Sequence, residues 1–118
     1  MNDAFTIKTT FKTSDLEAIT ENAFEYGIQD WCYDVKVLAW PKGMSEGLPS
    51  AILIQGGRLS LDTPEGPKTL SLAKMKKGLS LMLEHYGDVV HRLKVGHFDC
   101  VDSGILIQFA CFGDNVFG

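Results

Sequence analysis

The chain has 118 residues, of which 45% are hydrophobic and 22% charged, as is usual for one soluble globular domain. Its 15 acidic and 11 basic residues give a formal net charge of −4, which argues against direct binding of nucleic acid. No apolar run reaches the ~20 residues of a membrane span, and the first residues lack the features of a signal peptide. We therefore expect one cytoplasmic domain over residues 1–118, with no membrane segment.

The first part of the chain predicts a strand and then a helix. Residues 4–12 alternate apolar and polar side chains and are rich in threonine and aromatic residues, as strands are. Ser14 and Glu17 fit a capping box, in which each side chain accepts a hydrogen bond from a free backbone amide. Apolar residues follow at helical spacing until Gly27, which predicts a helix over residues 14–26.

Residues 28–40 have the most regular alternation in the chain and predict a long strand. One face is the more apolar and should point to the core; it carries Trp31, Tyr33, Val35, Val37 and Ala39. Residues 41–47 contain a proline and two glycines and are expected to form a loop.

Residues 48–55 are compatible with two structures. Ile52, Leu53 and Ile54 could form a buried strand that turns back at Gly56 and Gly57. Alternatively, a short helix begins at Pro49 and stops at Gly56. The segment is too short for periodicity to decide between the two.

The next segment predicts a hairpin followed by a helix. Residues 58–70 alternate on both sides of the turn Thr63-Pro64-Glu65-Gly66. Ser71 is suited to cap a helix that continues to Tyr86, and Gly87 should end it. Residues 88–98 are expected to be a connection that contains a short strand at 90–95.

The C-terminal segment has the densest apolar run. Asp99 is suited to be an N-cap, because its carboxylate can accept hydrogen bonds from the first helical turn. The helix that follows is apolar almost all round, which predicts burial on several sides. Gly113 should end it in a left-handed conformation, and Phe117 in the tail should dock on the core.

These elements predict an α+β fold in which about three helices cover a small antiparallel sheet. The C-terminal helix should be central and buried.

Side chains with catalytic or metal-binding chemistry do not form a recognisable pattern. His85, His91 and His97 are the three histidines, and their spacing does not place two of them on one helical face. Cys32 could pair with a histidine as a nucleophile, but no third group is indicated to orient the pair. The three cysteines lack a CxxC spacing and should be reduced thiols. We therefore expect no metal, no cofactor and no catalytic residues.

Aromatic residues are the best candidates for contact with a ligand or partner. Trp31, Tyr33 and Trp40 lie in or beside the predicted strand over residues 28–40, and aromatic rings often supply much of the binding energy of a contact surface. Arg58, at the start of the hairpin, is the fourth candidate. An exposed Trp40 would also favour self-association, so we expect a homo-oligomer, most simply a symmetric dimer.

The ending at residues 108–118 resembles the pattern Q-[YF]-A-x-F-G-[DE]-x-V-[YF]-G. This ending is typical of a family of small uncharacterised proteins encoded by bacteriophages and prophages of gut bacteria. The motifs Gly27-Ile28-x-x-Trp31-Cys32 and Gly56-Gly57-x-Leu59-x-Leu61 agree with the family in the same order. Family members often carry a basic pair where this chain has Tyr33-Asp34, and an acidic residue where it has Gly104. The resemblance favours the helix for residues 48–55.

The resemblance implies a mobile-element setting in the cytoplasm of a host cell. We expect a non-catalytic accessory binding protein of a phage or prophage that acts against host defence. It would mask a host defence protein or sequester a small nucleotide signal, an analogy that rests on the setting alone. The alternative is a structural or assembly protein of the phage particle. A third alternative is a small enzyme of unknown reaction.

Overall fold

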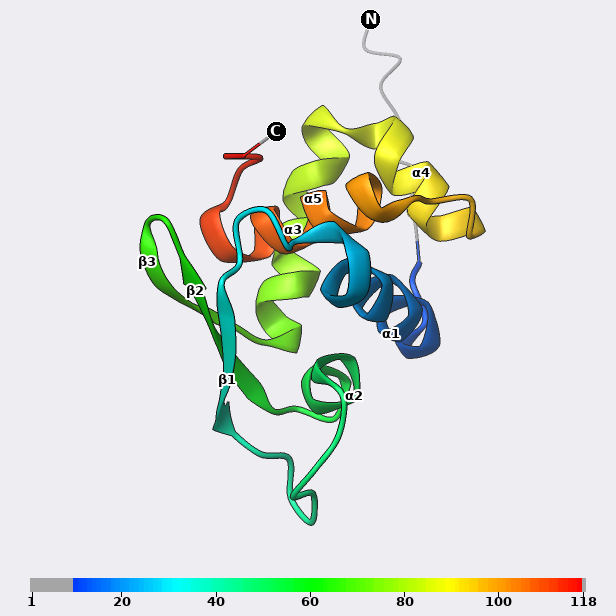
Figure 1. The fold of residues 1–118 in the computed structure, drawn as a ribbon. Coiled ribbons are helices and arrows are strands. Elements are labelled where there is room, and N and C mark those ends of the chain that lie inside the picture. The colour runs from blue at the N-terminus through cyan, green and yellow to red at the C-terminus, as the bar shows by residue number, and fades with distance from the viewer. Residues whose placement is uncertain (1–9, 118) are drawn as a thin grey trace, which may run out of the picture.

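The computed structural model describes residues 10–117. It contains a three-stranded sheet, five α-helices and one π-helical turn, η1 (Figure 1). The helices are α1 (Thr13–Asn22), α2 (Pro49–Ile54), α3 (Leu72–His85), α4 (Gly87–Val95) and α5 (Cys100–Phe112), with η1 at Ala23–Gly27. The strands are β1 (Asp34–Ala39), β2 (Arg58–Thr63) and β3 (Gly66–Leu70). The α+β architecture expected from the sequence is confirmed.

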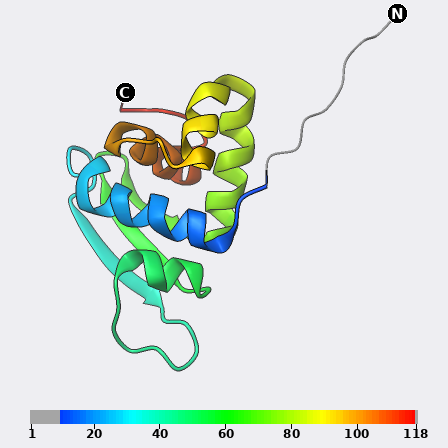
Figure 2. The ribbon, with the colours of Figure 1, turned by 90° about the vertical axis from the view of Figure 1, so that its right-hand side faces the viewer.

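The sheet is antiparallel in the order β1-β2-β3, and one of its faces is covered. Leu59, Leu61 and Leu70 are fully buried on the covered face, while Ser60 and Asp62 alternate with them on the outer face. Figure 2 shows the strands gathered on one side of the molecule. The hairpin of β2 and β3 turns at residues 63–66 as predicted, with the Thr63 hydroxyl donating to the Gly66 carbonyl over 2.7 Å.

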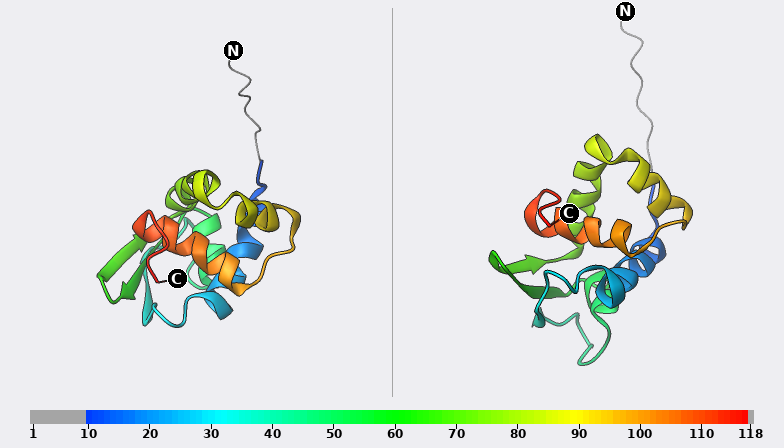
Figure 3. Two further views of the ribbon diagram at one scale, coloured as in Figure 1. Left: turned by 90° about the horizontal axis from the view of Figure 1, so that it is seen from above. Right: turned by 45° about the horizontal axis from the view of Figure 1, so that its top comes forward.

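Helix α5 lies at the centre of the fold. Every residue from Asp102 to Ala110 is buried, as an apolar circumference requires. Asp99 accepts a hydrogen bond from the amide of Asp102, and Gly113 adopts the left-handed conformation that ends the helix. Helices α3 and α4 and the η1 turn surround it (Figure 3). The predicted central, buried helix is thus confirmed.

Two predicted strand segments are wrong. Residues 28–33 form a turn, in which the amide of Cys32 donates to the carbonyl of Ile28 over 2.8 Å, and β1 begins only at Asp34. Residues 90–95 belong to α4, whose apolar Val89, Val90 and Leu93 are buried at helical spacing. Gly87 therefore begins a second helix as well as following the first. The predicted strand at residues 4–12 lies outside the described residues except for residues 10–12, which are not in a strand.

The start of α1 differs from the prediction, and the structure of residues 48–55 is now decided. The expected Ser14–Glu17 capping box is not formed; instead the amide of Lys12 donates to Asp15 over 2.8 Å, and the N-cap is Lys12, two residues before Ser14. Within residues 48–55, Pro49–Ile54 form α2, which decides between the two alternatives in favour of the helix. Ser71 caps α3 as predicted.

Helices α3 and α5 cross at Gly78 with almost no space between their backbones. A Cβ atom at Gly78 would lie 2.9 Å from the amide nitrogen of Ala110 and 3.1 Å from its Cα. Both atoms belong to the backbone of a buried helix and cannot rotate away. The absence of a side chain at Gly78 is therefore what allows the two helices to pack at this distance.

An ion pair joins α4 to the first turn of α5. The guanidinium of Arg92 donates two hydrogen bonds of 2.8 Å to the carboxylate of Asp102, whose side chain is buried. These hydrogen bonds to Arg92 lower the pKa of Asp102 below its ordinary value, against the opposing effect of burial. Arg92 also approaches the exposed Asp88 at 3.5 Å.

The close crossing of α3 and α5 predicts that a methyl group added at Gly78 destabilises the fold, whereas one added at Gly87 does not. We expect Gly78→Ala to lower the free energy of unfolding by about 1–3 kcal/mol, because α3 and α5 must separate to admit the methyl group. Gly87→Ala is the matched control, since a Cβ there meets no atom within 4 Å. Urea unfolding followed by circular dichroism measures both. Equal stability of the two variants would contradict the close crossing.

The Arg92–Asp102 pair predicts a pH dependence of stability. The pKa of Asp102 is lower in the folded than in the unfolded chain, so its stabilising contribution is present above the ordinary carboxyl pKa of about 3.9 and is lost as the pH falls below it. The free energy of unfolding should therefore decrease less between pH 6 and pH 3 in Asp102→Asn than in the wild type. Asp88→Asn, which removes only the longer contact to Arg92, should behave like the wild type.

Candidate functional site

The four residues predicted to form a contact surface do not come together. Trp31 is only 4% exposed, whereas Tyr33 is 63% and Trp40 43% exposed. Tyr33 precedes β1 and Trp40 follows it, so the six-residue strand holds them about 20 Å apart. Arg58 is exposed and lies opposite Ala39, next to Trp40. The four candidates are therefore divided among a buried tryptophan, Tyr33 at one end of the edge strand, and Trp40 with Arg58 at its other end.

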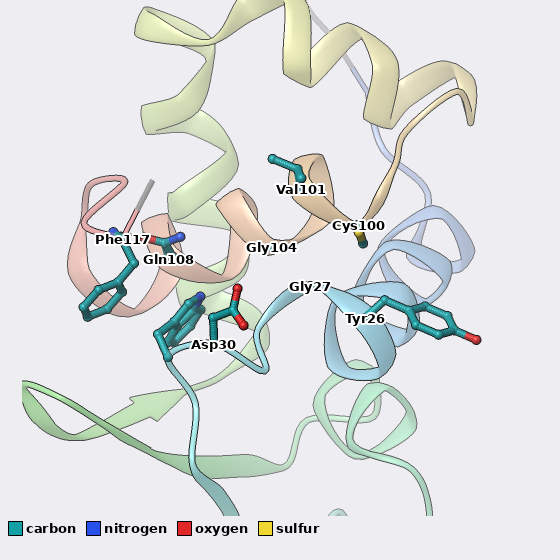
Figure 4. A pocket seen from close by; sticks show the side chains of 9 residues that line it. Tyr26, Gly27, Asp30, Cys100, Val101, Gly104, Gln108 and Phe117 are labelled. Carbon is teal, nitrogen blue, oxygen red and sulfur yellow. Dashed lines mark hydrogen bonds between the residues drawn. The ribbon is translucent and has the colours of Figure 1, made fainter.

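The buried member of this set, Trp31, lines a cleft of about 180 Å³ between the η1 turn, α5 and the C-terminal segment (Figure 4). The polar side chains that line it with Trp31 are those of Asp30, Gln108, Tyr26 and Cys100. In Figure 4 the carboxylate of Asp30 points toward α5, while the ring of Tyr26 points away to the rim.

The cleft exists because two glycines allow η1 and α5 to touch backbone to backbone. A Cβ at Gly27 would lie 2.5 Å from the carbonyl oxygen of Cys100, and a Cβ at Gly104 would collide with the carbonyl of Gly27. The π-helical turn is stabilised where it ends, because the side-chain amide of Gln29 donates to the carbonyl of Phe24 over 2.7 Å. Turns of this kind often occur at functional sites.

The C-terminal segment closes the other side of the cleft. The ring of Phe117 stacks on Trp31 with 5.6 Å between ring centroids, and both rings meet Phe112 edge to face. The amide of Phe117 donates to Oε1 of Gln108 over 2.7 Å. The predicted docking of Phe117 is thus confirmed, although its ring remains 36% exposed because it covers the cleft rather than entering the core.

The indole N–H of Trp31 is buried and has no hydrogen-bond partner among the described residues. A buried donor without a partner costs about 1–3 kcal/mol, so such groups are rare in folded proteins. Gln108 presents its side-chain amide to the same cleft, and its Oε1 is already occupied by Phe117. The polar groups at the cleft are therefore the buried indole N–H of Trp31, the amide nitrogen of Gln108 and the carboxylate of Asp30.

The cysteines have the character of packed thiols. Burial raises the pKa of Cys111 to about 12, and burial is also the main cause of a raised pKa at Cys32. The Cys32 thiol donates to the carbonyl of Asp34 over 3.6 Å. A raised pKa leaves little thiolate at neutral pH, so neither side chain is suited to act as a nucleophile.

No metal centre is formed by the histidine, cysteine, aspartate and glutamate side chains of residues 10–117. Within the same part of the chain, no helix is long and apolar enough to cross a membrane.

Of the residues that line this cleft, only Trp31 was predicted from the sequence as a binding residue. Two signals could have identified others. Gly104 interrupts an apolar helix, and an unexplained helical glycine often marks close backbone approach. Gln108 is a polar residue in the middle of the same buried helix, where a polar side chain needs a partner. Asp30 carried no signal, because its position depends on the turn after η1.

Comparison of the chain with protein-family models, with curated proteins and with solved structures finds no match.

Proposed function

We propose that the protein is a non-catalytic binding protein whose ligand enters the cleft beside Trp31. The indole N–H of Trp31 is the observation that carries this proposal, because a ligand acceptor would satisfy a donor that residues 10–117 leave buried and unpaired. The raised pKa values of the thiols at Cys32 and Cys111 support a binding role over a catalytic one.

The lining of the cleft restricts the chemistry of the ligand. Among residues 10–117, no lysine, arginine or histidine lines it, and Asp30 contributes a negative charge, so a phosphate inside the cleft would be repelled. Its volume of about 180 Å³ is below the usual range for drug-sized ligands, about 300–1,000 Å³. The best fit is a small planar group that presents an acceptor beside a donor. A nucleobase has this pattern, and the phosphates of a nucleotide would then remain in solvent.

We also propose a mobile-element setting, in which binding of a nucleotide signal counters a host defence system. The support for it is the sequence resemblance, whose segments around Gly27, Trp31 and Gln108 to Phe117 come from distant parts of the chain and line this one cleft. A ligand-binding accessory protein would not be needed to build a phage particle, which is the role that the alternative hypothesis assigns to it.

The ligand proposal predicts a specific effect of removing one N–H group. We expect free adenine, cytosine, guanosine or uracil to bind in isothermal titration calorimetry, with at least one of the four giving a measurable dissociation constant. Trp31→Phe keeps an aromatic ring but removes the donor, so it should weaken that binding about tenfold, the value of one hydrogen bond.

Trp40→Phe is the matched control, because it makes the same substitution at a tryptophan outside the cleft, and it should bind like the wild type. Absence of binding by all four compounds, or equal affinity of the Trp31 and Trp40 variants, would contradict the proposal.

The mobile-element setting makes a separate prediction. Disruption of the gene in a phage that carries it should leave particle assembly intact on a host that lacks defence systems. Mass spectrometry of purified particles should not detect the chain. Loss of assembly, or stoichiometric amounts of the chain in particles, would instead support the structural alternative.

A further inference from the structure

Strand β1 leaves one edge of the sheet open. The strand pairs with β2 on one side, and no strand of the described residues pairs with its other side. An open edge presents unpaired amide and carbonyl groups that can bind another strand. The opposite edge, at β3, is protected by Pro67, which has no N–H, and by Lys68 beside it. Of the two edges, β1 is therefore the one that is suited to further pairing.

Apolar side chains are exposed along this open edge. Tyr33 is 63% exposed just before β1, Leu38 is 52% exposed within it and Trp40 is 43% exposed just after it. Large apolar groups that remain exposed often mark a contact surface. Tyr33 lies at the start of this edge, whereas Leu38 and Trp40 lie at its other end, so a partner strand that pairs with residues 33–37 would cover Tyr33.

The charges of β1 are also left without partners. Asp34 and Lys36 are both exposed on the outer face of the sheet, and neither forms an ion pair with any of the residues 10–117. Asp34 lies directly opposite Asp62 of β2, and like charges in this position repel. A positive charge delivered from beyond the edge would be favourable next to Asp34.

Among the symmetric registers centred on residues 34 to 37, only one places a positive charge of the second copy opposite Asp34. Two β1 strands related by a two-fold axis pair antiparallel, and a register is defined by the residue that meets its own copy. Registers centred on Asp34 or on Lys36 place like charges opposite each other. A register centred on Val37 runs into the irregularity between Val37 and Ala39.

The register centred on Val35 avoids these conflicts. It places Asp34 opposite the partner's Lys36, and Lys36 opposite the partner's Asp34. It also places Tyr33 opposite the partner's Val37, and the two copies of Val35 face each other. Opposite charges and aromatic residues paired with β-branched residues are the favourable cross-strand combinations. The paired segment, Tyr33 to Val37, ends where the irregularity in β1 begins.

We propose that the protein forms a two-fold symmetric dimer by antiparallel pairing of β1 with β1 of a second copy, in the register centred on Val35. The two sheets then join into one sheet of six strands. This interface uses Asp34, Lys36 and Tyr33, none of which lines the cleft at Trp31, so the inference is independent of the proposed function.

A charge-swap experiment tests both the dimer and its register. We expect the wild type to have twice the 13.0 kDa mass of the chain in multi-angle light scattering at high micromolar concentration. Asp34→Lys and Lys36→Asp should each weaken the dimer about tenfold or more in analytical ultracentrifugation, because two attractive pairs become repulsive. The double variant Asp34→Lys/Lys36→Asp restores opposite charges at both pairs and should dimerise like the wild type.

Glu65→Lys is the matched control, because it reverses an exposed negative charge in the turn between β2 and β3, away from β1. It should leave the dimer intact. Circular dichroism confirms that each variant is folded, since all the substituted side chains are exposed. A wild type that remains at 13.0 kDa would overturn the proposal. A dimer that survives both single reversals, or that the double reversal fails to restore, would overturn the register and with it this interface.

Discussion

Helix α5 touches its neighbours through backbone as well as through side chains, and the rest of the structure depends on this close contact. Gly78 of α3 lies against the backbone at Ala110, and Gly27 of η1 lies against Gly104. A methyl group at any of the three glycines would meet backbone atoms that cannot move independently. An apolar helix enclosed in this way gains packing on all sides, which the net stability of a small domain requires.

The same contact shapes the cleft. Because η1 approaches α5 so closely at Gly27, the following turn carries Trp31 under the helix and leaves Asp30 at the mouth of the cleft. Phe117 then returns from the end of α5 and stacks on Trp31. Two segments that are far apart in the sequence thus meet at one indole ring. The ring is packed on its face, while its N–H has no partner in the part of the chain that the structure describes.

The segment from Asp30 to Lys36 connects the two surfaces that carry proposals. Trp31 faces the cleft, and only three residues later β1 begins as the open edge of the sheet. Trp31 and β1 face different surfaces because the turn at residues 28–32 ends at Tyr33. The amide of Tyr33 donates to the carbonyl of Asp62 over 2.9 Å and so begins the pairing with β2. A strand added to β1 would therefore lie near the cleft along the chain without using the residues that line it.

Local signals in the sequence determined most of the elements. The caps at Ser71 and Asp99, the left-handed stop at Gly113 and the turn before Gly66 act within a few residues, so the pattern alone predicted them. The apolar circumference of α5 likewise predicted its burial.

Tertiary contacts determined the structure of those segments for which the local sequence pattern allowed two structures or predicted the wrong one. The alternation at residues 28–33 predicted a strand, but the segment forms a turn that buries Trp31 against α5 and Phe117. No local signal in the sequence indicates this packing. Asp30 and Gln108 share a cleft only because η1 crosses α5 at Gly27 and Gly104. Such a crossing depends on the packing of residues far apart in the chain, which neither periodicity nor propensity specifies.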